Sequence, residues 1–240
     1  MKGSIQNLTI QGYQCLLYLP PDYETSYADY PVVYINGEED IAKIMEVIEP
    51  YFEVKCRTFI LVSILNRNWN EDYSPWPASA LINKEEAFGG GAAVYLDFLI
   101  NIVKPFIDDH YHTKQDKEST VLMGYSLGGL AALYALYTSK TFGKIGSLSG
   151  SLWFHGWVEF MEANLPRNTD AEVYFSLGRG EERSRNQTLA KVGECTLKAT
   201  EILKQQLKSS NQVILEWNNG GHFTEILQRY EKAILWLMKI

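Results

Sequence analysis

The stretch TVLMGYSLGGLAALYAL, residues 120–136, contains the pentapeptide GYSLG at 124–128, which matches the pattern GxSxG. A β-type run precedes the pentapeptide, and an apolar run that could form a buried helix follows it. Strand, tight turn and helix are the context of a nucleophile elbow, in which a serine on a sharp turn exposes its hydroxyl. The outer glycines suit such a turn because neighbouring chain approaches too closely for a Cβ. The alternative is a glycine-rich loop without chemistry, but the context favours Ser126 as a nucleophile.

A serine hydroxyl needs a base, which is almost always a histidine oriented by a carboxylate. In α/β-hydrolases the chain order is serine, acid, histidine. His110 and His112 precede the serine, and no acidic residue lies between residues 127 and 154 that could precede His155. His222 remains, on a Gly-Gly loop after a β-like run. We therefore predict His222 as the base, with a surface loop histidine as the alternative.

The acid is expected after a strand that ends at the same edge of the sheet. The buried run 172–177 is closed by Gly178, and Glu181 and Glu182 follow it. Asp170 lies before this strand, Glu172 at its start, and Glu194 and Glu201 in the following helical segment. The residues alone leave both glutamates as candidates, and the unused one would be a solvated loop residue.

Length and composition limit the class of protein. A chain of 240 residues suits one α/β domain over residues 1–240, and 46% hydrophobic with 21% charged residues is ordinary for a globular protein. The net charge of −7 argues against a nucleic-acid partner, which would need a basic face. No signal-type or transmembrane run is present in the sequence, so we expect no membrane partner and a cytoplasmic location. Cys15, Cys56 and Cys195 have no CxxC spacing, so we expect reduced thiols, no metal and no cofactor.

Alternating and continuous apolar runs predict a mixed sheet that becomes parallel, with helices on both faces. The expected strands are Ser4 to Ile10, Tyr13 to Leu19, Val32 to Ile35, Phe59 to Leu65, Thr120 to Met123, Ile145 to Ser149, Glu172 to Leu177 and Val213 to Trp217. The expected helices are Ile41 to Glu49, Ala92 to Tyr111, Leu127 to Tyr137, Trp157 to Ala163, Leu189 to Leu207 and Phe223 to Met238. The first two strands form a hairpin, and the order predicts an eight-stranded α/β-hydrolase fold.

Motifs spread along nearly the whole chain resemble the "putative esterase" family of α/β-hydrolases, which includes esterase D and enterochelin-esterase-like proteins. They are LYLPPDY at 17–23, YPVVYING at 30–37, DYSPW at 72–76, GGG at 89–91, GYSLGG at 124–129, SLSGSLWF at 147–154 and GGHF at 220–223. In similar enzymes the acid stands three residues after the glycine that closes its strand, which from Gly178 selects Glu181 over Glu182. Many relatives have Asp there, and they often have His or Asp in place of Asn36.

The oxyanion hole needs two donors aimed at the charge that develops on the carbonyl oxygen. One is the backbone N–H of Leu127, the residue after the nucleophile. The other comes from the loop after the third strand, and the resemblance implies the backbone N–H of Glu38. We expect the Glu38 side chain to point to solvent, because its charge would oppose the oxyanion.

Trp76 and Trp153 are expected on loops at the carboxyl edge of the sheet, and we predict that they line the substrate pocket rather than fill the core. Arg67 is a further pocket candidate, since together with Arg183 and other arginines it could attract an anionic substrate. Solvated surface is the alternative for these arginines. Gly89 to Gly91 lack the spacing of a phosphate-binding loop and predict a flexible loop.

The predicted function is a cofactor-independent serine ester hydrolase that acts on a small or medium-sized carboxylic ester through an acyl-enzyme. Ser126 attacks, His222 transfers the proton and Glu181 orients His222. A non-catalytic binding member of the fold is the alternative from another class. Acyl transfer and thioester hydrolysis would use the same residues. The sequence does not separate these chemistries, and it leaves the acyl group, the alcohol and the oligomeric state open.

Overall fold

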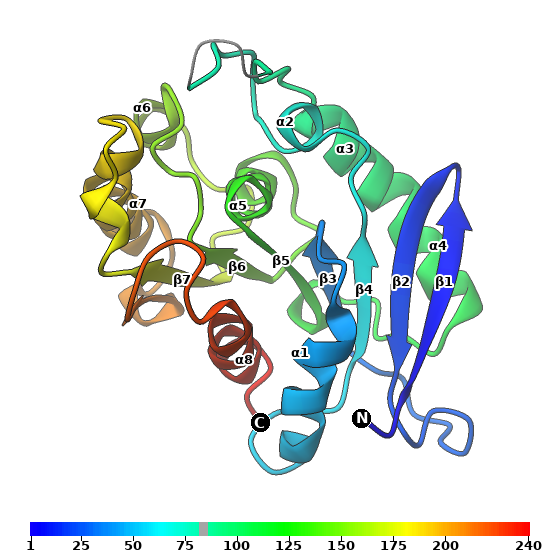
Figure 1. Cartoon of the computed structure of the whole chain (residues 1–240). Helices are drawn as coiled ribbons and strands as arrows, with labels where there is room; N and C mark the ends of the chain where they lie inside the picture. Colours follow the sequence, from blue (N-terminus) through cyan, green and yellow to red (C-terminus); the bar gives the residue numbers. More distant parts are fainter. Residues whose placement is uncertain (82–85) are drawn as a thin grey trace.

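A computed structural model describes residues 1–81 and 86–240 of the chain. Its centre is one sheet with the strand order β1-β2-β4-β3-β5-β6-β7-β8 (Figure 1). The strands are β1 (Ser4–Ile10), β2 (Tyr13–Leu19), β3 (Val32–Asn36), β4 (Ile60–Ile64), β5 (Thr120–Tyr125), β6 (Lys144–Leu148), β7 (Glu172–Gly178) and β8 (Val213–Asn218). The pairs β1–β2 and β2–β4 are antiparallel, and every other pair is parallel. The predicted mixed sheet with an antiparallel N-terminal hairpin is confirmed.

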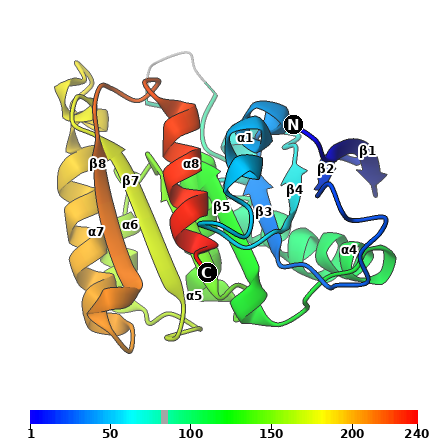
Figure 2. The same ribbon diagram turned by 90° about the horizontal axis from the view of Figure 1, so that it is seen from below.

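Helices cover both faces of this sheet. They are α1 (Ile41–Ile48), α2 (Trp69–Asp72), α3 (Ala92–Phe98), the π-helical η2 (Leu99–Val103), α4 (Lys104–His110), α5 (Leu127–Thr138), α6 (Trp157–Ala163), α7 (Val192–Gln206) and α8 (Ile226–Leu237). Short 3₁₀ segments are η1 (Glu49–Tyr51), η3 (Lys117–Ser119), η4 (Glu181–Arg183), η5 (Leu189–Lys191) and η6 (Ser210–Gln212). Figure 2 shows α1 and α8 side by side on one face, while α4, α5, α6 and α7 lie on the other.

The apolar core accordingly has two parts, one on each face of the sheet. Helix α1 buries Ile41, Ile44, Met45 and Ile48, which form a stripe at helical spacing, together with the apolar face of α8. The opposite part packs α3 to α7 against the sheet. Helix α5 is buried along almost its whole length, because it lies in the middle of that layer.

Two predicted helices differ from the structure at identifiable residues. The expected helix from Ala92 to Tyr111 is interrupted by the π-helical turn η2, which ends two residues before Pro105. Proline has no N–H to continue the i→i−4 pattern, and a wider turn accommodates the missing donor. The C-terminal helix begins at Ile226 instead of Phe223, after Glu225 with a φ of 56°. The three residues in between belong to the loop that carries His222.

The carboxyl ends of the parallel strands meet along one edge of the sheet. The register aligns Asn36 with Gly124, Tyr125 with Leu148, and Gly178 with Asn218, so the loops after β3, β5, β6, β7 and β8 leave from the same side. In Figure 1 the arrowhead of β4 points toward α2, and the two chain ends lie on the far side. Ligands of open α/β sheets bind at this edge. None of the helices within the described ranges is long and apolar enough to cross a membrane.

Candidate active site

Ser126 occupies a sharp turn between β5 and α5. Its φ of 55° and ψ of −122° lie in a region that L-residues rarely adopt and that costs roughly 1–3 kcal/mol. The turn is held on both sides, because Ser126 N–H donates to Leu148 O at 2.9 Å and Leu130 N–H donates to Ser126 O at 3.1 Å. This is the geometry of a nucleophile elbow, in which backbone strain keeps the serine hydroxyl exposed.

The two outer glycines of GxSxG are needed for close packing at this turn. A Cβ on Gly124 would lie 2.5 Å from the carbonyl carbon of Gly128, and one on Gly128 would lie 3.1 Å from Asn36 O. The Asn36 side chain fixes the neighbouring loop to the elbow by donating to Gly128 O at 2.9 Å and accepting from Tyr95 Oη at 2.7 Å. The amide at position 36 therefore connects β3 to the start of α5.

The Glu181 carboxylate is buried, with 7% of the residue exposed, in the 3₁₀ turn after β7. Its Oε1 accepts from Gly178 N–H at 2.8 Å, Ser149 Oγ at 2.7 Å and Arg229 Nη1 at 2.9 Å, and its Oε2 lies 2.8 Å from His222 Nδ1. Burial raises the pKa of this carboxyl, but the hydrogen bonds from His222, Ser149 and Gly178 outweigh burial and lower the pKa below its ordinary value. The carboxylate is therefore held in its ionised form.

The neighbouring Glu182 faces elsewhere. Its side chain is exposed and lies over α7, where a Cβ on Gly193 would meet Glu182 Oε1 at 1.9 Å. Of the two glutamates that the residues alone left open, the structure brings Glu181 to His222.

His222 lies on the loop between β8 and α8. Its ring packs edge-on against Tyr125 with the centroids 5.3 Å apart, and its backbone C=O accepts a hydrogen bond from Tyr125 Oη. With Nδ1–H directed at Glu181, the other ring nitrogen, Nε2, is the one that can accept a proton. Tyr125, the residue before Ser126, thus holds the backbone of the histidine loop.

Ser126 and His222 line the same cavity, which has a volume of about 530 Å³. The hydrogen bond recorded for Ser126 Oγ in the described part of the chain is to Ser151 Oγ at 3.3 Å. Further lining residues are Trp69, Asn70, Leu81, Glu86, Phe88, Leu127, Trp153, Gly180, Glu181, Arg183, Ser184, Leu189, Val192 and Phe223. Among the described residues, no group of three or more His, Cys, Asp or Glu side chains could hold a metal ion.

A second, more polar groove of about 740 Å³ adjoins this cavity. The two share Leu81, Phe88 and Trp153 as a common wall. The far side of the groove is formed by α6 and α7, which contribute Glu159 and Lys198. Trp153 therefore lines the cavity and also divides it from the groove.

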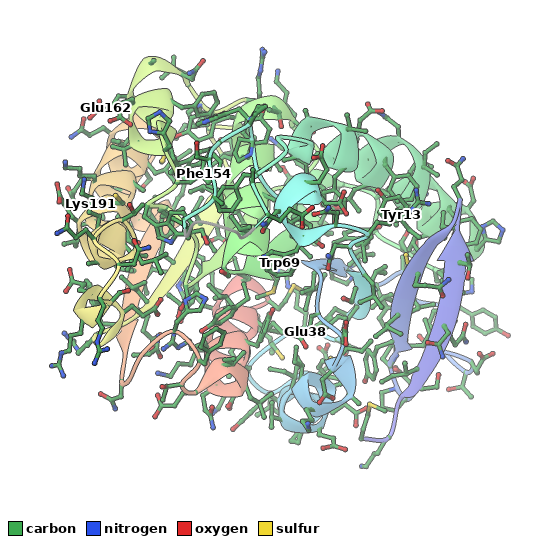
Figure 3. The ribbon with its side chains drawn as sticks, turned by 45° about the horizontal axis from the view of Figure 1, so that its top comes forward. Tyr13, Glu38, Trp69, Phe154, Glu162 and Lys191 are labelled. Carbon is green, nitrogen blue, oxygen red and sulfur yellow. The ribbon has the colours of Figure 1, made fainter. Side chains whose placement is uncertain are left out.

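The other two predicted pocket residues lie outside the cavity. Trp76 is half-buried in an aromatic cluster, stacks on Trp157 with the centroids 6.2 Å apart, and donates from Nε1 to His155 O at 2.9 Å. Arg67 lies 4.0 Å over the ring of Tyr13 and donates to Gln11 O at 2.8 Å. In Figure 3 Tyr13 is beside the β1–β2 hairpin, well away from Trp69 on the cavity wall. Arg67 thus packs on the hairpin.

The two predicted oxyanion donors differ in their placement. Leu127 is the first residue of α5 and lines the cavity, and first-turn amides have no acceptor within their helix. The N–H of Glu38 instead donates to Ser63 Oγ at 3.1 Å, and Glu38 does not line the cavity. Its carboxylate accepts from Asp40 N–H at 2.9 Å, in a hydrogen bond at the exposed surface of its own loop.

Arg229 is a site residue that the sequence reasoning missed. It lies on α8, is 0% exposed, and contacts Glu181 through Nη1. A signal for it was present, because Arg229 falls on the same helical face as the buried residues Ala233 and Leu237. An arginine within an apolar stripe indicates a buried partner of opposite charge.

The sheet order, the strained serine turn and the loops along one edge define an α/β-hydrolase. A family model described as "Putative esterase" matches residues 9–227, so the chain belongs to this esterase family. Uncharacterized protein YbbA of Bacillus subtilis strain 168 is 30% identical over 243 residues, covering 99% of this chain and 97% of the relative. The chain is thus an esterase by family.

Solved structures share the fold at lower sequence identity. An IroE-like serine hydrolase from Shewanella oneidensis superimposes with a TM-score of 0.85 at 21% identity, over 98% of this chain and 80% of that one. Siderophore hydrolase EstB from Aspergillus nidulans gives 0.75 at 19% identity, over 99% and 95% of the two chains. These likenesses confirm the predicted α/β-hydrolase architecture.

Proposed function

We propose that this esterase hydrolyses carboxylic esters through an acyl-enzyme, with Ser126 as nucleophile, His222 as base and Glu181 as the acid that orients His222. The observation that carries the proposal is the 2.8 Å contact between Glu181 Oε2 and His222 Nδ1, beside the cavity that Ser126 also lines. The site thus combines a base, the carboxylate that orients it and a strained serine around one cavity of substrate size.

In the proposed reaction Ser126 Oγ attacks the ester carbonyl while its proton passes to Nε2 of His222. The Leu127 N–H stabilises the oxyanion from the start of α5. The tetrahedral intermediate breaks its bond to the alcohol oxygen, and the His222 proton goes to the leaving alcohol. Water then attacks the acyl group with the same histidine as base, the acyl bond to Ser126 Oγ breaks, and His222 returns the proton to Oγ as the carboxylic acid leaves. Before attack the serine hydroxyl turns from Ser151 toward the imidazole, since catalytic hydrogen bonds commonly tighten only with substrate bound.

We propose that the acyl group is aromatic and of small to medium size. The rings of Phe88, Trp153 and Phe223 line the cavity, and Arg183 offers a donor there for a polar ring substituent. The similar structure from Aspergillus nidulans is a siderophore hydrolase, so we add a siderophore ester, a catechol-siderophore lactone, to the test compounds. The adjoining groove leaves room for the rest of a larger ester.

Labelling with a radiolabelled organophosphate followed by mass spectrometry tests the nucleophile. We expect one adduct, on Ser126, and a loss in kcat of roughly 10⁴ to 10⁶-fold in Ser126→Ala. The Ser151→Ala variant is the matched control, because it removes the neighbouring hydroxyl and should still be labelled. An adduct on another residue, or full activity in Ser126→Ala, would contradict the proposed nucleophile.

A panel of aromatic and aliphatic esters of graded size, with the catechol-siderophore lactone, tests the substrate class. We expect kcat/KM to be higher for aromatic acyl groups and to rise with pH on its acid side, because the base must be neutral to accept a proton. His222→Ala should remove this acid limb and most of the activity, whereas His155→Ala should keep both. Equal rates on aliphatic esters would contradict the aromatic preference, and no turnover of any ester would favour a binding role.

A further inference from the structure

A buried cation lies beside the proposed triad and takes no part in the proposed chemistry. We propose that Arg229 is a positioning residue that fixes both the acid and the base of the ester hydrolase, an inference that rests on the proposed function. It contacts Glu181 directly and His222 through the histidine loop.

The Arg229 guanidinium contacts both Glu181 and the loop that carries His222. Its Nη1 donates to Glu181 Oε1 at 2.9 Å, to Tyr125 Oη at 3.0 Å and to Ser149 Oγ. Its Nη2 donates at 2.8 Å to the backbone C=O of Gly221, which is the residue before His222. Oε1 of Glu181 is thereby fixed, which leaves Oε2 for the imidazole. The planar fork of arginine allows this, whereas the compact ammonium group of lysine would not reach both sets of acceptors.

Tyr125 extends the contact to the third component. Its hydroxyl accepts from Arg229 Nη1 and donates to the backbone C=O of His222, and it is the residue next to Ser126. The nucleophile turn, the acid and the base loop therefore share one buried hydrogen-bonded cluster, which we call the Arg229 cluster: Tyr125, Ser149, Glu181, Gly221 and Arg229.

Stability alone does not account for a cation at this position. Arg229 is fully buried on the inner face of α8, and its Nε has no recorded hydrogen-bond partner within the described residues. Taking a charge pair out of water is costly, and replacing such pairs by apolar residues of similar size is often neutral or stabilising. Apolar residues occupy the neighbouring positions Ala233 and Leu237 of the same face. The charge is better explained by what it positions.

The charge also has an electrostatic consequence for the base. Arg229 offsets the negative charge of Glu181 as seen by His222, so the charged imidazolium is stabilised less than it would be by an isolated carboxylate. The titratable groups that face the guanidinium are Tyr125 from β5 and Glu181 from η4. The lysine on its own helix, Lys232, pairs instead with Glu216 at 2.6 Å. Removal of the Arg229 charge should therefore move the acid limb of kcat/KM to higher pH.

The test compares Arg229→Met and Arg229→Lys with Lys104→Met. The control removes the buried cation of the Lys104–Asp108 pair in α4, whose partners Gln115 and Thr113 belong to the following loop. For Arg229→Met we expect a loss in kcat of roughly 10² with KM within about threefold, since displaced catalytic groups cost about this much. The acid limb should shift upward by on the order of one pH unit. Arg229→Lys should restore the position of the limb but only part of kcat, and Lys104→Met should change neither.

A second readout needs no substrate. The His222 imidazole can be titrated by NMR in the resting protein, and its midpoint should rise in Arg229→Met and stay in place in Lys104→Met. An Arg229→Met protein with unchanged kcat, limb and midpoint would overturn the positioning role. If Arg229→Met fails to fold, Tyr125→Phe removes one member of the Arg229 cluster and should lower kcat at constant KM, and an unchanged kcat there would also overturn it. If the wild type hydrolyses no ester, the proposed function fails, while the NMR titration still decides the role of Arg229.

Discussion

The Lys104–Asp108 pair and the Arg229–Glu181 pair are both largely removed from water, but they belong to different kinds of structure. The first joins residues four apart on α4, at 2.6 Å, with side chains 11% and 12% exposed. The second joins residues 48 apart in sequence, at 2.9 Å, with side chains 0% and 3% exposed. The first pair can form as soon as its helix does. The second exists only when α8 has packed against the loop after β7.

The difference shows where buried charge contributes to function. Lys104 offers a single ammonium, and its second recorded acceptor is Gln115 O at 3.5 Å. Arg229 distributes its donors over two side chains besides Glu181 and over the backbone of the histidine loop. A local pair stabilises one helix by a small amount, whereas the non-local pair fixes the geometry between the elements that carry the proposed triad.

The largest difference between the two pairs is expected in kcat when the carboxylate charge of each pair is removed. We expect Glu181→Gln to lower kcat by roughly 10² to 10⁴-fold, because His222 loses the group that holds its tautomer and stabilises its charged form. Asp108→Asn is the matched change in the other pair and should leave kcat within about twofold. Steady-state kinetics on one aromatic ester measures both. Equal losses would mean that the Glu181 effect is one of general stability.

The next largest difference is expected in the free energy of unfolding when the acidic side chain of each pair is truncated to alanine. Glu181→Ala leaves the Arg229 charge buried without its partner, and we expect a loss of about 3–5 kcal/mol in the free energy of unfolding. Asp108→Ala should cost less, about 1 kcal/mol, because the Lys104 side chain keeps 11% of its surface exposed and its ammonium retains Gln115 O as an acceptor. Urea unfolding followed by fluorescence gives both values. A cost for Asp108→Ala as large as that for Glu181→Ala would contradict the contrast.

The pH dependence of stability should show a smaller effect with a definite sign. The pKa of Glu181 is lowered in the folded chain, so its contribution is fully present above the unfolded value of about 4.3 and is lost as pH falls through the folded pKa. The free energy of unfolding should therefore decrease below about pH 4 more steeply in the wild type than in Glu181→Gln. Chemical denaturation across the acid range tests this. Identical slopes in the two proteins would show that Glu181 does not contribute.

The smallest change is expected at Glu182, one residue from the proposed acid. Glu182→Gln removes an exposed charge that lies over α7, so kcat should stay within about twofold and the free energy of unfolding within about 0.5 kcal/mol. The same assays used for Glu181→Gln apply. A larger kinetic loss at Glu182 than at Glu181 would transfer the role of acid to its neighbour.

Much of the fold was predictable because it depends on local pattern. The continuous apolar strands and the GYSLG turn gave the sheet class and the position of Ser126, since chain order and strand ends constrain where loops can meet. The structure then brought Glu181 rather than Glu182 to His222. Strand order and the insertion of β4 between β2 and β3 are set by tertiary packing, which period-2 patterns do not encode.

The residues that were misplaced share a physical reason. Arg67 and Trp76 lie in loops near the expected edge of the sheet, yet partners distant in sequence decide the direction of each side chain. The partner of Arg67 is Tyr13, and that of Trp76 is the aromatic cluster around Trp157. The N–H of Glu38 is likewise taken by Ser63, which lies in another strand. Position along the chain fixes which edge a residue approaches but not which neighbour it meets.

The hydrogen bond from Tyr125 to the backbone of His222 has a consequence for the engineering of such sites. A designer who copied only Ser126, Glu181 and His222 into a new scaffold would leave out the hydrogen bond that joins the serine turn to the histidine loop. We therefore expect the smallest transferable module to include Tyr125 and Arg229 as well, because supporting groups must hold reactive atoms to within about 0.5 Å. The variable position inside GxSxG is therefore a design variable to be chosen together with the residue at position 229.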